Sequence, residues 1–298
     1  MAIVILLLYI LQCGGCQNIS HPPNVIVAKD GSRNYNTIMA AVLASPNNRI
    51  YEEYVQIDSW KTNIVFIGEG MDKTIISGNK SYGGGIGTYD TATVGVDGKG
   101  FMAQDIAFRN TAGAANFQAV ASRASAEFTT FYRCQFDGKQ FYRECIILGT
   151  IDFICRDATA IFQSCQYIAI TAQQTSDNGA TGLILQNCTL RLATPDAGDN
   201  VAMYLGRPWG NFSRTVIMQS YIDMLINPRG WIEFEGKSIV QPYYLEYQNK
   251  GVGADTKRRV KWASATNDPR IVSNFTVRNF INGDKWIPST IPHYLDLL

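Results

Sequence analysis

The sequence predicts an all-β protein built as a single-stranded parallel β-helix, and two observations support this fold class. Short apolar runs of four to eight residues, rich in Val, Ile, Phe, Tyr and Thr, recur along the 298-residue chain and end at Gly, Asn, Asp or Ser. Similar runs such as IAF, FYRC, IFQSC, LILQNC and VIMQS return every 20 to 30 residues. That period is typical of a solenoid, and coils made of strands form a β-helix. An irregular all-β sandwich is the alternative.

The expected elements follow in chain order. MAIVILLLYILQCGGCQNIS joins about ten apolar residues to small ones, as in a secretory signal, so we expect a signal peptide at residues 1–17. A buried N-terminal strand is the alternative. NYNTIMAAVLASP has helical spacing and a proline stop. The expected strands then follow in NIVFIG, TIISG, FMAQDIAF, FTTFYRCQF, CIILGTIDFI, TAIFQSCQYIAI, TGLILQNCTL and TVIMQSYI. Without a linker to divide them, residues 18–298 should form one domain.

Composition excludes several classes of function. Hydrophobic residues make up 46% of the chain and charged residues 17%, which permits a sizeable core and argues against disorder. The net charge of +1 gives no case for a nucleic-acid partner, and we expect the KRRVK cluster at 257–261 to be a solvated face. The apolar N-terminal run is too short for a comfortable membrane span, so no membrane partner is expected.

Cysteines and sequons fit an extracellular chain. Four cysteines form an even set after the expected leader: Cys134, Cys145, Cys165 and Cys188. Cys165 and Cys188 are 23 residues apart, so one coil, or about 4.8 Å, would separate them and allow a disulfide. Cys134 and Cys145 are only 11 apart, and Cys155 is left over. Five N-x-S/T sequons give weak further support for secretion, at Asn18, Asn79, Asn187, Asn211 and Asn274.

Carboxylates, amides and arginines are the candidate chemical groups. Only two histidines occur, both near the chain ends, which argues against a Ser-His-Asp triad. Asp152 stands inside the apolar run GTIDFI, where a carboxylate is costly to bury, so it is either a nucleophile or acid–base group or a turn residue. In YLGRPWG, Arg207 could grip a carboxylate and Trp209 could stack on a sugar; a surface turn is the alternative.

These segments together resemble the plant pectinesterases, or pectin methylesterases. The resemblance begins near Val25 and is carried by VIVAKDGSRNYNTIMAAVLASP, IVFIGEGMDKTIISGNKS, DTATVGVDGKGFMAQDIAFRNTAG, QAVASR, GTIDFICRDATAIFQSC, YLGRPWGNFSRTVIMQSYI and INPRGWIEFEG. It implies a right-handed parallel β-helix of the pectin lyase-like kind. It also implies hydrolysis of methyl esters of polygalacturonate, releasing methanol, with no cofactor and no metal.

The resemblance also assigns roles to single residues. Asp152 matches the nucleophile that forms an acyl-enzyme, and Arg207 matches the arginine that orients it. Gln118 matches an amide on the substrate and oxyanion side. Thr88 and Trp209 match substrate-contacting positions, as Gln118 and Arg207 also do. Cys134 and Cys145 match the family's disulfide pair.

Two departures from the family pattern bear on activity. Between the first two cysteines, CQFDGKQFYREC lacks about ten residues, including the QDTLY aspartate that acts as general acid and base in relatives. Gln140 matches either the Gln of QDT, an oxyanion amide, or the Gln of RQFY. A second shortening follows Pro46. Cys155 and Arg156 replace Phe and Gly beside the expected nucleophile.

Two functions are therefore consistent with the sequence. The first is a pectinesterase acting in cell-wall modification, and the second is a catalytically impaired relative that only binds pectin or a wall partner. A lyase or polygalacturonase is disfavoured, because neither an acidic calcium cluster nor a paired-aspartate motif is found. The expected protein is a secreted, extracellular, glycosylated monomer of the cell wall. Its expected partners are methyl-esterified pectin and a proteinaceous pectinesterase inhibitor.

Overall fold

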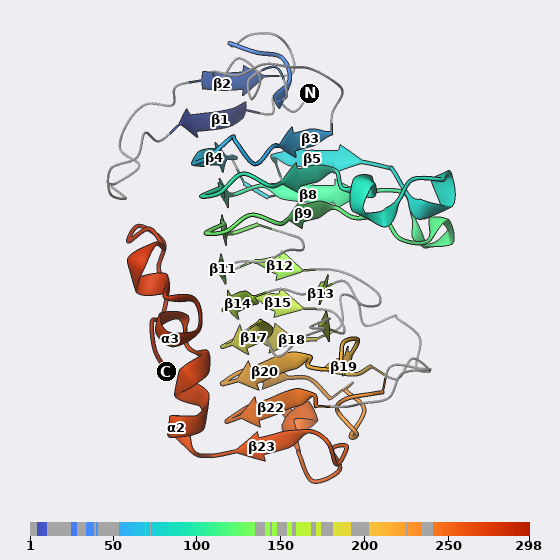
Figure 1. Ribbon diagram of the computed structural model, residues 1–298, viewed down its shortest axis with the longest axis vertical. Helices are drawn as coiled ribbons and strands as arrows, with labels where there is room; N and C mark the ends of the chain where they lie inside the picture. Colours follow the sequence, from blue (N-terminus) through green and yellow to red (C-terminus); the bar gives the residue numbers. More distant parts are fainter. Residues whose placement is uncertain are drawn as a thin grey trace. The chain divides into compact units, whose positions relative to one another are not determined.

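The computed structural model (Figure 1) describes most of the chain after residue 54 and a few segments before it. The described residues are 5–10, 25–28, 34–38, 40, 54–68, 70–71, 73–134, 141–143, 145–147, 154–156, 159–167, 171–173, 181–191, 203–224, 226–233 and 241–298. They divide into two compact units, residues 1–139 with 288–291 and residues 140–287 with 292–298. The helix expected at 34–46 lies mostly outside the described residues.

Unit 1 carries the strands of three parallel sheets and two further strands. Its elements are β1 (Ile5–Ile10), β2 (Val25–Ala28), β3 (Val55–Ile57), β4 (Ile64–Ile67), β5 (Ile75–Gly78), η1 (Tyr82–Gly84), η2 (Thr88–Thr91), β6 (Val94–Val96), β7 (Met102–Gln104), β8 (Ala107–Asn110), η3 (Ala114–Asn116), β9 (Ser122–Ala124) and β10 (Thr130–Tyr132). The parallel pairings are β4–β7–β10, β3–β6–β9 and β5–β8. β1 pairs antiparallel with both β2 and β4. The expected signal peptide stays a prediction.

Unit 2 repeats the same plan and ends in short helices. Its elements are β11 (Phe141–Arg143), β12 (Ile146–Ile147), β13 (Ile154–Arg156), β14 (Thr159–Gln163), β15 (Gln166–Tyr167), β16 (Thr171–Gln173), β17 (Gly182–Gln186), β18 (Thr189–Leu190), β19 (Gly206–Pro208), β20 (Arg214–Met218), β21 (Tyr221–Ile222), β22 (Tyr243–Tyr247), η4 (Val252–Ala254), β23 (Ser264–Thr266), α2 (Pro269–Val272), η5 (Ser273–Phe275), α3 (Val277–Ile281) and η6 (Gly283–Lys285). Its parallel sheets are β11–β14–β17–β20–β22–β23, β12–β15–β18–β21 and β13–β16–β19.

Successive strands of the chain visit the three sheets in turn, so one circuit of the chain is one coil. Figure 1 shows the strands of each unit stacked coil on coil. This topology confirms the predicted right-handed parallel β-helix. The sandwich alternative is wrong, because its strands would pair antiparallel.

Side chains in register fill the interior of the coils. In unit 2, Ile161, Ile184, Val216 and Leu245 are buried and stack through four successive strands. In unit 1, edge-to-face aromatic pairs take this place, and Phe101 lies 5.2 Å from Phe66 and 5.8 Å from Phe131, measured between ring centroids. Stacking like side chains in a dry interior is the main source of stability in a β-helix, because each coil buries little alone.

A left-handed residue turns the chain at the same corner of six coils. A positive φ occurs directly after β7, β10, β14, β17, β20 and β22, at Asp105, Arg133, Ser164, Asn187, Gln219 and Gln248. Neighbouring corners bind one another: Arg133 forms a bidentate ion pair with Asp105, and Asn187 Nδ2 donates to Ser164 Oγ at 3.0 Å. These contacts compensate for backbone conformations that side chains usually avoid.

Candidate active site

Arg207 and Trp209 lie on and directly after the last strand of the β13–β16–β19 sheet. The backbone register places Cys155, Ala172 and Arg207 in one row across the three strands. Arg207 and Trp209 are both partly exposed. The last strand of this sheet therefore presents an arginine, and an indole follows two positions later, just beyond the strand.

Close packing beneath β19 explains the glycine before Arg207. A Cβ at Gly206 would lie 2.1 Å from Thr171 Oγ1 and 2.8 Å from Thr171 O. Thr171 Oγ1 itself donates to Leu205 O at 3.1 Å, so its place is fixed. After Trp209, Ser213 closes a tight turn by donating from Oγ to Gly210 O at 2.7 Å. The strand that carries Arg207 is thus held at both ends.

A buried polar network supports β19 from the next coil. Trp231 is fully buried and forms a parallel bridge with Gly206, and its Nε1 donates to Glu246 Oε1 at 3.1 Å. Glu246 also accepts two hydrogen bonds from Arg259, at 2.7 and 2.9 Å, and both side chains are almost fully buried. A buried carboxylate is tolerated when its lone pairs are satisfied in this way.

Two of the predicted site residues, Asp152 and Gln140, lie outside the described residues. In the sequence Asp152 stands two positions before Ile154, the first residue of β13. β13 is the first strand of the sheet whose last strand carries Arg207. Asp137 and Asp157, the other acids near these positions, also lie outside the described part.

Thr88 and Gln118, the remaining predicted residues, lie together in unit 1. Tyr82 N donates to Gln118 O at 2.8 Å, and Val120 N donates to Thr91 Oγ1 at 3.1 Å. Thr91 Oγ1 in turn donates to Thr88 O at 2.7 Å. These bonds join the η1–η2 segment to the segment before β9, which brings Thr88 and Gln118 onto adjoining segments.

Sequence reasoning missed a cluster beside Thr88. Arg123 lies with its guanidinium carbon 3.8 Å from the centroid of the Tyr89 ring, and it binds Asp97 with both terminal nitrogens. The hydrogen bond from Arg123 holds the pKa of Asp97 below its usual range, against the effect of burial, and Gln56 and Tyr89 add to this. Arg123 belongs to QAVASR, the same motif as Gln118, so its position in that motif was the available signal.

Phe117 is a second feature that the sequence did not reveal. It precedes Gln118, has a left-handed φ of 61° and is 71% exposed. A bulky residue in that conformation is uncommon and marks a locally constrained backbone. The constraint lies directly beside a predicted substrate-contacting amide.

The registers Gln163↔Gln186 and Gln166↔Thr189 put Cys165 and Cys188 on adjacent coils, as predicted, while both disulfides stay predictions. Among the described residues, no cluster of three or more His, Cys, Asp or Glu side chains could hold a metal ion. No helix in the described part is long and apolar enough to cross a membrane.

Comparison with known proteins shows the family to which this chain belongs. Residues 24–284 match the sequence profile named Pectinesterase, so the chain belongs to the pectinesterase family. Pectinesterase 2 of Citrus sinensis is 42% identical over 301 residues, covering 90% of this chain and 59% of that protein. A pectinesterase/pectinesterase inhibitor of Prunus persica is 42% identical over 308 residues, covering 90% and 58%. The chain thus spans less than two thirds of the length of these relatives.

Solved structures show the same fold. The carrot pectin methylesterase has a TM-score of 0.85 and 36% identity, and the match covers 94% of this chain and 100% of that one. An Aspergillus niger pectin methylesterase has a TM-score of 0.76 and 27% identity, covering 89% and 96%.

The alignment also bears on the missing segments. It runs over 301 positions with the Citrus protein but uses about 90% of the 298 residues here, so roughly thirty positions of the relative have no counterpart in this chain.

Proposed function

We propose that this protein hydrolyses methyl esters of polygalacturonate, forming pectate and methanol. The observation that carries the proposal is the position of the family motif YLGRPWG. Gly206–Pro208 of this motif form β19. The first strand of the same sheet, β13, begins two residues after Asp152. Arg207 supplies a permanent positive charge and two parallel donors for a carboxylate. Trp209 supplies a flat apolar face for a sugar ring.

The chemistry proceeds in two steps. The Asp152 carboxylate attacks the ester carbonyl, and the Gln118 amide, with Gln140 where it serves as the second amide, stabilises the oxyanion. The C–O bond to the methoxy group breaks, and the departing methoxide takes a proton from water and leaves as methanol. Water then attacks the acyl-enzyme, which releases the galacturonate carboxylate and restores Asp152. Thr88 and Trp209 hold the polymer. No step needs a metal or cofactor.

Methanol release from methylated pectin by the purified protein tests the proposal. Asp152→Ala should lower the rate by roughly 10⁴-fold or more, because the nucleophile is lost. Arg207→Lys keeps the charge but removes the bidentate geometry, so a loss of roughly 10²-fold is expected. Release of methanol at an unchanged rate by Asp152→Ala would refute the assignment.

A slower enzyme is favoured by the length of one connection. From Tyr132, the end of β10, to Arg143, the end of β11, the chain has 11 residues. The shortest register spacing between consecutive strands of the long sheet in unit 2 is 19, from Leu245 to Ser264. The connection is therefore about ten residues shorter than a coil, which agrees with loss of the general-acid segment. Without that acid the rate should fall ~10²–10⁴-fold, and at the extreme the protein only binds pectin.

The proposed setting is the plant cell wall, reached by secretion, with a monomeric glycoprotein acting on pectin. Asn79, Asn211 and Asn274 are exposed sequon residues that can carry a glycan. Asn187 is half-buried and its amide donates to Ser164, so it is a poorer acceptor. Several relatives are named as pectinesterase/pectinesterase inhibitor, which supports an inhibitor as a second partner.

A further inference from the structure

The KRRVK cluster at 257–261 divides into buried and exposed residues. Arg259 is only 6% exposed at its side chain and Val260 is buried, whereas Lys257, Arg258 and Lys261 are exposed. The sequence predicted a solvated face for all five residues. Two of them instead hold the segment in place, and we call residues 257–261 the cationic loop.

The buried residues fix the loop to the previous coil. Arg259 donates to Glu246 through two bonds and to Gly253 O at 2.7 Å, and Val260 N donates to Arg229 O at 3.1 Å. A segment held by a buried ion pair displays its remaining side chains at defined positions. The cations therefore lose less conformational freedom on binding than those of a mobile loop would.

The loop continues the face of the coil stack that carries Arg207. Gly206, at the start of β19, pairs with Trp231 on the following coil. Arg229, two residues before Trp231, accepts the bond from Val260, so the loop lies one further coil along. At about 4.8 Å per coil, the backbone of the loop is roughly 10 Å from that of β19.

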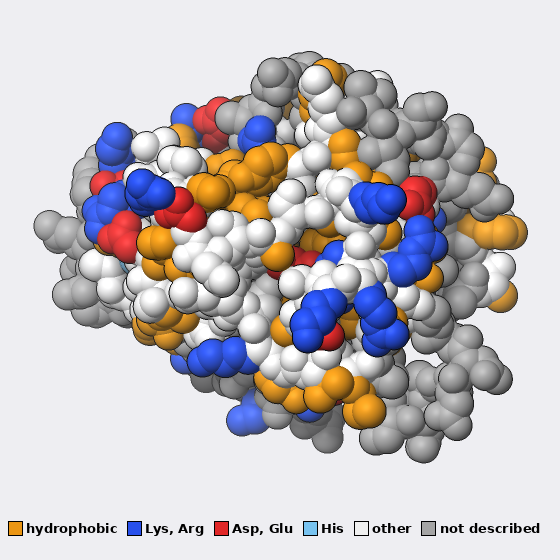
Figure 2. Space-filling model, turned by 90° about the horizontal axis from the view of Figure 1, so that it is seen from below, with side chains coloured by type: hydrophobic (Ala, Val, Ile, Leu, Met, Phe, Trp, Pro, Cys, Tyr) orange, Lys and Arg blue, Asp and Glu red, His pale blue; other side chains and the backbone are white. Residues whose placement is uncertain are grey.

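Among the described residues, no acid forms an ion pair that would neutralise the three exposed cations. None of them forms an ion pair within the described structure, and the adjacent acid is Asp255, whose Oδ1 accepts from Lys257 N at 3.1 Å. Figure 2, which views the C-terminal end of the stack, shows Lys and Arg side chains in several groups on this end, with Asp and Glu side chains beside them. Within the loop itself, residues 257–261 include four cations and no acid. The local charge is therefore positive although the whole chain is nearly neutral.

We propose that Lys257, Arg258 and Lys261 bind the carboxylates of de-esterified polygalacturonate, an inference that rests on the proposed function. Each turnover would convert a neutral methyl ester into a carboxylate, so polymer that has passed the site carries new negative charge. Cations about two coils beyond Arg207 lie where a polymer extending from that strand along the stack can reach them. They would favour binding of the acidic polymer over the neutral one.

The test compares binding of pectate and of fully methyl-esterified pectin to the intact chain and to the variant Lys257→Gln/Arg258→Gln/Lys261→Gln. Pectate binding should weaken about tenfold at low salt, because three exposed charge contacts are lost. Binding of the neutral polymer should not change. The salt dependence of pectate binding should also become shallower.

A matched variant removes three exposed cations of the same unit from other positions: Arg191→Gln/Lys250→Gln/Lys285→Gln. It should bind pectate as the parent does. Equal losses in both triple variants would show an effect of net charge and overturn the proposal, as would unchanged pectate binding in the loop variant. Methanol release, measured separately, decides the proposed function: pectate binding that depends on the loop without methanol release would refute the esterase activity alone.

Discussion

Gly206 shows how one residue can set the position of a catalytic candidate. Any side chain there would overlap Thr171, whose hydroxyl is fixed by its hydrogen bond to Leu205 O. The strand could accept a methyl group only by moving away from its neighbour. Arg207 follows directly and would move with it.

Gly206→Ala should therefore destabilise the protein by about 1–3 kcal/mol, the usual effect of overpacking, and should lower kcat for methanol release more than tenfold. Thermal unfolding and steady-state kinetics measure the two effects. Gly87→Ala is the matched control for stability, because its Cβ would meet only Asp90 Oδ2, at 3.6 Å. An alanine at 206 that leaves both stability and kcat unchanged would show that β19 is free to adjust.

Arg123 is expected to act as a positioning residue through Tyr89. Arg123→Lys loses the bidentate contact with Asp97 and much of the stacking on Tyr89, each about 1 kcal/mol, so kcat/KM should fall about thirtyfold. The fall should appear mainly in KM, because Thr88 is expected to contact substrate. Lys99→Ala is the control, since Lys99 contacts the ring of Phe128 instead.

The Asp97 carboxylate gives this cluster a defined pH dependence. Its folded-state pKa is depressed, so its contribution to stability is present above the unfolded value of about 4 and is lost as pH falls through the lower folded value. The difference in thermal stability between the parent and Arg123→Ala should therefore shrink as pH falls below about 4, leaving only the part due to stacking of Arg123 on Tyr89. A constant difference down to pH 2 would contradict the ion-pair argument.

At the scale of elements, hydrophobic runs reveal the strands but not the corners between them. IFQSC and LILQNC were recognisable as repeats because their apolar residues face one shared interior. The left-handed residues at 164 and 187 have no such signature, since Ser and Asn are ordinary in any turn. Their conformation depends on contact with the next coil, which a local pattern cannot show.

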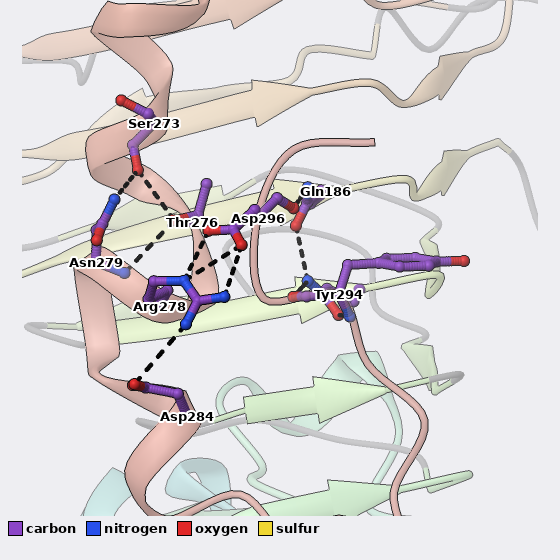
Figure 3. A network of polar contacts seen from close by, with 9 residues as sticks. Gln186, Ser273, Thr276, Arg278, Asn279, Asp284, Tyr294 and Asp296 are labelled. Atoms are coloured by element: carbon purple, nitrogen blue, oxygen red, sulfur yellow. Dashed lines mark hydrogen bonds and ion pairs between the residues drawn. The ribbon is translucent and has the colours of Figure 1, made fainter.

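The C-terminal residues form another element that the sequence did not indicate. Gln163 pairs with Tyr294 through two bonds, at 2.7 and 2.9 Å, and Gln219 pairs with Leu298 through bonds of 2.9 and 3.1 Å. Gln186 donates to Asp296 O between them, at 3.0 Å. Figure 3 shows this tail beside α3, where Arg278 binds the Asp296 carboxylate.

Acid should loosen this tail before it unfolds the coils. Arg278 lowers the pKa of Asp296, so the stabilising effect of the pair is present above about pH 4 and is lost as pH falls through the folded value. Hydrogen-exchange protection of the Tyr294 and Leu298 amides should drop below that pH, while protection in β17 persists. In Asp296→Asn the drop should disappear and protection should be low throughout. Protection that is equally high in this variant would show that the glutamines alone hold the tail.

At the scale of the whole molecule, contiguous sequence motifs predicted part of the candidate site, whereas residues that are far apart in the sequence were not predicted. Arg207 and Trp209 were predicted because their motif is contiguous in sequence. Arg123, Asp97 and Tyr89 were not predicted. Arg123 is 26 residues from Asp97 and 34 residues from Tyr89 in the sequence, and none of the three belongs to a recognisable pattern alone. Asp152 and Gln140 lie outside the described residues, so their roles stay predictions.

The number of residues between successive strands of one sheet indicates where the chain is shorter than a full coil. Strand registers along the long sheet of unit 2 advance by 19 to 32 residues, for example 23 from Ile161 to Ile184 and 32 from Leu183 to Thr215. From the end of β10 to the end of β11 the chain advances by only 11 residues. The division between the two compact units falls within this connection, after Lys139. The chain is therefore short at the segment that carries the general acid in relatives.

Restoring about ten residues between Gly138 and Phe141, with the family's QDTLY sequence, should raise the rate of methanol release ~10²–10⁴-fold, because protonation of the leaving methoxide would no longer depend on water. The same insertion in an Asp152→Ala background should give no increase, since without the nucleophile no methoxide is displaced for the donor to protonate. An insertion with the aspartate of QDTLY changed to Asn separates coil length from chemistry: it should restore thermal stability but not the rate. Equal rates for the Asp and Asn insertions would show that coil length, rather than a missing acid, limits the chain. A parent chain that already turns over as fast as the Asp insertion would refute the deletion argument altogether.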